Sequence, residues 1–366
     1  MNIISLPVSR SLRWASPSRR CVAGIIASVF LSLNGRAQTV MDGTTYCLPK
    51  TTIDVVLLVE KTTTQPGELC QYAERFMKKA DAPAEPSVAY RLLSADIVPA
   101  AIADTAKQFT ARNDNKHNIQ RVAISPQGII LAVNADPSLP AERIPFKAAP
   151  KMHLPNAHDY MNQDILAAGS KAKMAELVAQ EIYDIRESRS LLTKGQADFM
   201  PKDGEQLRIM MQSLDQQEAA LMQVFSGTTV KDTTEVVVSY IPEKATEGDV
   251  LFRFSQRFGL VDADDLSGIP YYISITDLHQ VPVNSAVAEG KLPKDNAEIY
   301  VNLPGRIRAD LTSMSRPVAS LELMATQFGR CESLDNELFG KKLFTQLVYH
   351  PLTGNIESIS TDMVKK

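Results

Sequence analysis

The sequence predicts an α+β fold in which two related, mostly antiparallel β-rich domains are separated by an antiparallel helical hairpin. Runs of β-branched residues bounded by turn formers lie on both sides of the chain's centre, and two segments between them repeat apolar residues at helical spacing. The length agrees, because 366 residues exceed what one hydrophobic core usually serves. The predicted boundaries are an N-terminal leader over residues 1–37, a first domain over 38–160, the hairpin over 161–227 and a second domain over 228–366.

The leader has the pattern of an export signal. Several arginines precede an apolar run over residues 21–33, and small residues near Ala37 suit a signal peptidase. The run is shorter than the roughly 20 residues that span a bilayer as a helix, and no later stretch is long and apolar enough. We therefore expect an exported protein of the periplasm or cell envelope, with no transmembrane segment in the mature chain.

Cleavage at this point would make the chain more acidic. It removes five arginines and no acidic residue, which takes the formal net charge from −3 to −8. Nucleic acid and anionic membrane surfaces attract basic proteins, so neither is expected as a partner.

The first domain is predicted to consist of strands and one short helix. Residues 51–61 are rich in β-branched side chains and predict a strand with a buried face. Pro66 and Gly67 open a short helical pattern that reaches Phe76, and Pro126-Gln127-Gly128 is typical of a tight turn. Further strands are expected at residues 90–98, 107–111, 121–125 and 128–134.

Residue types at the ends of the two central helices define the hairpin. Gly195 tolerates the left-handed conformation that ends a helix, so the first helix should end there. Asp203 can cap the second helix, with Gln206 reaching back to it, and Gly227 can end it.

The second domain is interpreted as an internal repeat of the first. Residues 236–240 match the first strand, and residues 251–258 match residues 69–76, at an offset near 181 or 182. The Pro-x-Gly turn near residue 126 also has a counterpart near residue 351. A longer second copy of a duplicated unit would explain this order.

The outward face of the hairpin is the candidate interaction surface, and its residues are Asp184, Arg186, Glu187 and Arg189. The alternative is an ordinary solvated face, which is what most charge runs on helices are. No histidine lies between Asp159 and Leu278, so the carboxylates are not expected to hold a metal.

The mature chain would keep Cys47, Cys70 and Cys331. Cys47 and Cys70 are nearest in sequence and form a possible disulfide in an oxidising compartment. The alternative is that all three thiols are buried or unpaired.

No complete catalytic motif is present, so neither enzymatic activity nor a cofactor is predicted. Ser170 and Lys173 match the Ser-x-x-Lys pattern of penicillin-recognising enzymes, but the Lys-Thr-Gly element that completes it is missing. A hydrolase that uses Ser170 with Lys173, or Cys70, stays open as an alternative.

Several longer strings carry a resemblance to a known family, among them Glu-Lys-Thr-Thr at residues 60–63 and Ile-Tyr-Asp-Ile-Arg-Glu-Ser-Arg at residues 182–189. With residues 44–51, 72–75 and 201–204, they resemble exported proteins of Bacteroidetes grouped as domain of unknown function 4831. The resemblance covers nearly the whole mature chain. It implies export and a full-length architecture, and it carries over no site residue.

These observations favour a non-enzymatic scaffold or protein-interaction module that binds another envelope protein. The alternative is a glycan or small ligand bound in the cleft between the two domains. The only tryptophan, Trp14, lies in the leader, so Tyr271, Tyr272 or Tyr300 would have to supply the sugar platform.

Overall fold

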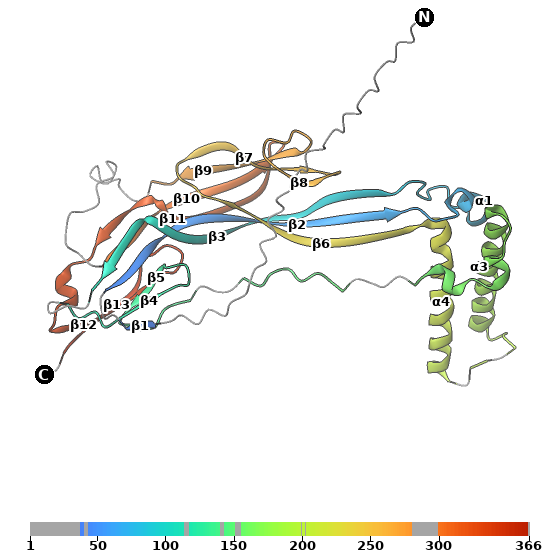
Figure 1. Cartoon of the computed structure of the whole chain (residues 1–366), viewed down its shortest axis with the longest axis horizontal. Coiled ribbons are helices and arrows are strands. Elements are labelled where there is room, and N and C mark those ends of the chain that lie inside the picture. Colours follow the sequence, from blue (N-terminus) through green and yellow to red (C-terminus); the bar gives the residue numbers. More distant parts are fainter. Residues whose placement is uncertain are drawn as a thin grey trace, which may run out of the picture. The chain divides into compact units, whose positions relative to one another are not determined.

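The protein is described by a computed structural model (Figure 1), which covers residues 37–39, 43–112, 117–139, 143–150, 155–198, 200–201, 203–279 and 299–364. Residues 1–36 of the predicted leader lie outside the described part. The described strands all pair antiparallel wherever they form ladders, and four α-helices accompany them. The predicted α+β class is confirmed.

One long strand, β2 (Thr44–Gln65), organises the structure. It pairs on one side with β3 (Ser87–Ala111) and on the other with β6 (Thr228–Tyr240), so the strand order is β3-β2-β6. Its β-branched and aliphatic residues alternate between the two faces of the sheet, as the pleat requires. Ile53, Val55 and Leu57 are fully buried on one face.

That buried face of β2 packs against a second sheet. The core between the two sheets joins Ile53, Val55 and Leu57 to residues such as Ile273 and Ile307. This is sheet-on-sheet packing, in which the inward side chains of both layers interdigitate. The second sheet has the order β11-β10-β9-β7-β8 and consists of β7 (Thr246–Ser255), β8 (Gly259–Val261), β9 (Ile269–Asp277), β10 (Tyr300–Ser313) and β11 (Arg316–Ser333).

A third sheet combines strands from both ends of the chain. A separate core lies against it, and Tyr46, Tyr300 and Tyr349 meet there. The Tyr46 hydroxyl accepts from the Tyr300 backbone N–H at 3.0 Å, and the Tyr349 hydroxyl donates to the Tyr300 carbonyl at 3.0 Å. The sheet has the order β1-β4-β5-β12-β13, from β1 (Ala37–Thr39), β4 (Arg121–Ile124), β5 (Ile130–Val133), β12 (Leu343–Tyr349) and β13 (Ile356–Met363).

The predicted division into two β-rich domains is not confirmed. Val55 of β2 pairs with Val238 of β6, and Val133 of β5 pairs with Leu347 of β12. Both hydrophobic cores likewise take residues from the two predicted halves. Residues on either side of the helices therefore form common sheets and common cores.

The predicted repeat corresponds to the fold only in part. Residues 69–76 form a 3-10 turn, η1 (Cys70–Tyr72), followed by the helix α1 (Ala73–Met77), whereas residues 251–258 lie in β7 and the turn after it. These two segments have different secondary structure, so their sequence match does not reflect equivalent places in the structure.

A different correspondence links β2 with β10 and β3 with β11. Each pair of strands has a register shift at a Leu-Pro step, at Leu48-Pro49 in β2 and at Leu303-Pro304 in β10. The residue before each Leu-Pro step donates its backbone N–H to the carbonyl oxygen of a turn glycine. Cys47 donates to Gly128 at 2.8 Å, and Asn302 donates to Gly354 at 2.9 Å. The equivalent units are thus a long two-stranded ribbon and the hairpin that follows it.

The helical segment lies between β5 and β6. Ser170 caps α3 (Lys171–Lys194) by accepting from the Lys173 backbone N–H, and Gly195 ends α3 with φ of 70°. Asp203 caps α4 (Gly204–Ser226) by accepting from the Gln206 backbone N–H at 2.7 Å. The predicted helix ends at Gly195 and Asp203 are confirmed. Short elements precede and follow them: η2 (Ala157–Tyr160), α2 (Gln163–Leu166) and, before β12, η3 (Asn336–Phe339).

Two glycines let α4 approach the end of β2. A Cβ on Gly227 would lie 2.1 Å from the Gln65 carbonyl oxygen, and one on Gly67 would lie 2.2 Å from the Val224 carbonyl oxygen. The Leu69 backbone N–H donates to the same Val224 carbonyl at 2.8 Å. Backbone contact this close is possible only without side chains at both positions.

Glu235 of β6 binds the described segment 143–150, which lies between β5 and η2 in the sequence. The Arg143 guanidinium donates to Glu235 through both terminal nitrogens, one of them at 3.1 Å, and the Phe146 backbone N–H adds a bond of 3.0 Å. The hydrogen bonds from Arg143 lower the pKa of Glu235 below its ordinary value, against the opposing effect of desolvation.

This anchor predicts a pH-dependent contribution to stability. A carboxyl group whose pKa is lowered by folding stabilises the native state above its unfolded pKa, and that contribution is lost as the pH falls through the folded pKa. We expect Glu235→Gln to lower the free energy of unfolding by about 1 kcal/mol at pH 7. The difference in the free energy of unfolding between wild type and Glu235→Gln should shrink below about pH 4, near the ordinary pKa of glutamate. Urea denaturation at pH 7, 5 and 3.5 measures it, and a constant difference would contradict this role.

Candidate functional site

Two of the four residues of the predicted interaction surface join α3 to α4. Arg186 Nε lies 2.6 Å from Glu218 Oε1, and Arg189 Nη1 lies 2.7 Å from Asp215 and 2.9 Å from Glu218. The hydrogen bond to Asp215 is the main reason that the pKa of Arg189 is raised, and the charge of Glu218 adds to it. Residues further along α3 pair with residues earlier in α4, as two antiparallel helices require.

Among the described residues, the other two residues of that surface form no hydrogen bond or ion pair with α4. Asp184 accepts from Gln180 Nε2 at 2.9 Å, within the same helix, and both Asp184 and Glu187 are exposed. The structure therefore divides the predicted surface. The arginines face the partner helix, and the carboxylates face outward.

A groove runs between the end of α3 and the first half of α4, and we call it the helix groove. Its floor is apolar, with Leu191 and Leu192 on one side and Met210 and Leu214 on the other. The cavity has a volume of about 450 Å³. Its lining residues are Ser188, Leu191, Leu192, Ala197, Asp198, Met210, Ser213 and Leu214.

The core that the two helices share extends along only part of their length. The helical core joins Val178, Ile182 and Ile185 of α3 to Leu221 and Phe225 of α4. This core lies toward the start of α3 and the end of α4, and α1, η2 and α2 also contribute residues to it. The end of α3 and the start of α4 also carry apolar residues, and these belong to no core cluster of the described chain. They are Leu191, Leu192, Leu207, Met210 and Met211.

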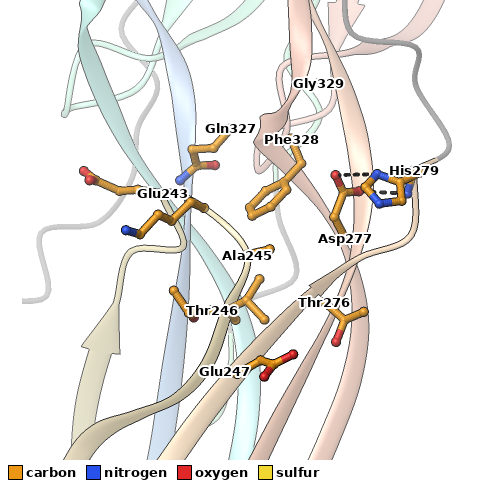
Figure 2. A pocket seen from close by; sticks show the side chains of 12 residues that line it. Glu243, Ala245, Thr246, Glu247, Thr276, Asp277, His279, Gln327, Phe328 and Gly329 are labelled. Carbon is orange, nitrogen blue, oxygen red and sulfur yellow. Dashed lines mark hydrogen bonds and ion pairs between the residues drawn. The ribbon is translucent and has the colours of Figure 1, made fainter.

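A larger pocket of about 800 Å³ lies beside β11 (Figure 2). Leu303 pairs with Arg330 but Gly305 pairs with Ala325, so residues 326–329 form a bulge opposite Pro304. A bulge changes the direction in which its side chains point. Here it places Phe328 in the pocket, and we call this cavity the bulge pocket.

Carboxylate and imidazole side chains line the bulge pocket together with Phe328. Asp277 and His279 come from the end of β9, with 3.0 Å between His279 Nδ1 and Asp277 Oδ2. Glu243 comes from the connection between β6 and β7, and Glu247 comes from the start of β7 (Figure 2). An aromatic face among polar groups can bind a small polar ligand.

The family of the chain follows from a comparison of its sequence. A family model described as a domain of unknown function (DUF4831) matches residues 42–357. The chain belongs to this family. The match begins just before β2 and ends within β13, so both the helix groove and the bulge pocket lie inside the DUF4831 region. No curated protein and no solved structure matches the chain.

Two of the three tyrosines considered as sugar platforms stack on other aromatic rings in this DUF4831 protein. Tyr271 stacks on Phe252 with ring centroids 4.6 Å apart, and Tyr300 stacks on Phe109 at 3.9 Å. Tyr300 is also buried. The aromatic residue that does line the large pocket, Phe328, was missed, because only the bulge of β11 brings it there.

The structure does not bring Cys47 and Cys70 together. Cys47 lies near the start of β2 and Cys70 follows its end, and a strand rises about 3.3 Å per residue, so the two lie far beyond disulfide reach. The three cysteines in the described part of the chain are free. Burial raises the pKa of the Cys331 thiol to about 11, and desolvation, followed by the charge of Asp104, raises the pKa of the Cys47 thiol.

This arrangement predicts selective alkylation. Cys47 and Cys331 are buried whereas Cys70 is half-buried, and only the thiolate reacts. Iodoacetamide at pH 8 should modify Cys70 in the native protein, and the other two only after unfolding in urea. Peptide-level mass spectrometry measures each site separately. A Cys47–Cys70 disulfide peptide, or equal native modification of all three, would contradict it.

The Ser-x-x-Lys pattern serves the start of α3. The Ser170 hydroxyl accepts from the Lys173 backbone N–H at 3.2 Å, and the Lys173 ammonium lies 3.1 Å from Glu176. Among the described residues, no group of three or more His, Cys, Asp or Glu side chains is placed to hold a metal ion. No helix in the described ranges is long and apolar enough to cross a membrane.

Proposed function

We propose that this protein is an exported, non-enzymatic interaction module of the cell envelope that binds another envelope protein through its helices. The helix groove carries this proposal. Its apolar floor includes Leu191, which is exposed, and Met210 and Leu214, which are half-buried. These residues lie on two long helices whose other ends share a core. Exposed apolar surface of this kind marks binding sites for other proteins.

Two further observations support the proposal. The leader pattern of the sequence supports export. Ser170 caps a helix and Lys173 pairs with Glu176. These contacts support a structural role for the two residues and not a hydrolytic one.

Site-specific photo-cross-linking in cells that produce the protein tests this function. A photoreactive residue replaces Ser213, which lines the groove and is exposed, and the matched control replaces Ala172, exposed in the first turn of α3. We expect a discrete adduct from position 213 and none from position 172. Absence of an adduct at 213, or the same adducts from both positions, would contradict the proposal.

A second candidate function is the binding of a glycan or another small polar ligand in the bulge pocket. The Phe328 ring among Glu247, Asp277 and His279 favours it, because such a ring can stack on a sugar while polar groups bind its hydroxyls. A thermal-shift screen with envelope glycans, repeated on Phe328→Ala, tests it. Stabilisation of wild type that is lost in the variant is expected, and no stabilisation by any glycan would contradict it.

A further inference from the structure

We propose that the helix groove binds a single amphipathic helix of a partner protein and that the polar face of this helix is basic. The inference deepens the proposed interaction function and rests on it. The proposed function says only that a partner protein binds. This inference adds the secondary structure and the charge of the partner's binding segment.

The walls of the groove favour a helical partner. Ser188, Leu191 and Leu192 follow one another at helical spacing on α3, and Met210, Ser213 and Leu214 do so on α4. A third helix laid between two others buries residues at i, i+3, i+4 and i+7 in such a groove. Met210 adds a flexible side chain that adapts to the shape of a partner.

The edges of the groove favour a basic partner. Asp184 lies one helical turn before Ser188, Glu187 lies one turn before Leu191, and Asp198 lines the groove itself. The cations nearby on α3 do not balance these three charges, because Arg186 and Arg189 are bound to Glu218 and Asp215 of α4 and Lys194 in the last turn supplies only one further positive charge. Lysine or arginine on the partner would therefore meet an excess of carboxylates.

The same charges disfavour a second copy of this chain in the groove. A two-fold pairing would bring the same surface of both copies together. The acidic edge of one copy, with Asp184, Glu187 and Asp198, would then meet the same acidic edge of the other copy, and like charges across an interface weaken it. The α4 side of the groove, with Ser213, provides no compensating cation.

Binding of model peptides to the whole protein tests the inference. The probe is a fluorescein-labelled peptide of leucine and lysine with leucines at i, i+3, i+4 and i+7. One control peptide has glutamate in place of lysine, and another has the leucine–lysine composition in an order without an apolar face. Fluorescence anisotropy should show saturable binding of the amphipathic basic peptide only.

Two variants locate the binding. Ser213→Trp fills the groove from an exposed position and should abolish binding while circular dichroism stays unchanged. Asp184→Lys with Glu187→Lys should weaken binding roughly tenfold, as expected for two lost ion pairs. The matched control, Glu176→Lys with Glu357→Lys, reverses two exposed carboxylates outside the groove and should leave binding unchanged.

Equal binding of the glutamate peptide, binding unaffected by Ser213→Trp, or equal weakening by both double variants would overturn the inference. These outcomes are separable from failure of the proposed function. A cross-link from position 213 without peptide binding would retain the interaction and remove the basic helix. Peptide binding without a cross-link in cells would show a competent groove and count against the interaction function.

Discussion

Leu57→Ala should lower the free energy of unfolding by about 3 kcal/mol, the cost of a cavity where a buried leucine was. Leu57 is fully buried at the centre of β2, between Ala95 of β3 and Val236 of β6. It also belongs to the core between the two stacked sheets. Its loss should therefore weaken both layers.

Leu58→Ala is the matched control for this effect. Leu58 is the next residue of the same strand, but it lies on the opposite face and is half-buried. We expect a cost of about 1 kcal/mol, because less apolar surface returns to water. Urea denaturation of both variants measures the difference. Equal effects would show that the two faces of β2 are buried to the same extent.

Gly227→Ala should destabilise the protein by about 4 kcal/mol. Gly227 ends α4 with φ of 68° and ψ of −169°, a region that is essentially restricted to glycine. A Cβ there would also lie 2.1 Å from the Gln65 carbonyl oxygen, so either the end of α4 or the end of β2 would have to move. The contact between the helices and the sheet should weaken as a result.

Gly195→Ala separates strain from helix capping. Gly195 also ends a helix with positive φ, at 70°, but nothing lies within 4 Å of a Cβ at that position. We expect a cost of about 1 kcal/mol, from the left-handed conformation alone. Urea denaturation of the two variants provides the comparison, and loss of soluble protein for Gly227→Ala alone would agree with it. Similar small costs would contradict the close approach of α4 and β2.

The sequence was sufficient for features that depend on neighbouring residues. The end of α3 at Gly195 and both ends of α4, at Asp203 and Gly227, follow from capping preferences, and the structure has each of them. The turn at Gly128 follows from Pro126-Gln127-Gly128, and Gly128 has φ of 86°. The β-branched run at residues 51–61 likewise became the centre of β2.

Features that depend on distant pairing could not be predicted in the same way. β3 was expected as two strands, because Pro99 and the following alanines interrupt its pattern. Pro99 is accommodated because β3 is an edge strand of its sheet and needs no donor on its outer side. The pairing of β2 with β6 joins residues far apart in the chain, and no local pattern indicates it.

The candidate site shows the same limit. The charges of Arg186 and Arg189 were visible in the sequence, but their contacts with Glu218 and Asp215 depend on how α3 and α4 face each other. The bulge pocket needs three separate segments and an irregular register in β11. A signal did exist for the helix groove, because Leu207, Met210 and Met211 continue the apolar stripe of α4 beyond the helical core.

The accessibility of the helix groove in living cells tests the central claim most directly. Ser188→Cys places a thiol in the groove, Ala172→Cys is the control on the same helix, and Cys70→Ala removes the half-buried native thiol from both. N-ethylmaleimide should label both positions readily in the purified protein. In producing cells we predict slow labelling at position 188 and unchanged labelling at position 172, because a partner covers the groove. Equally fast labelling of both positions in cells would contradict the claim.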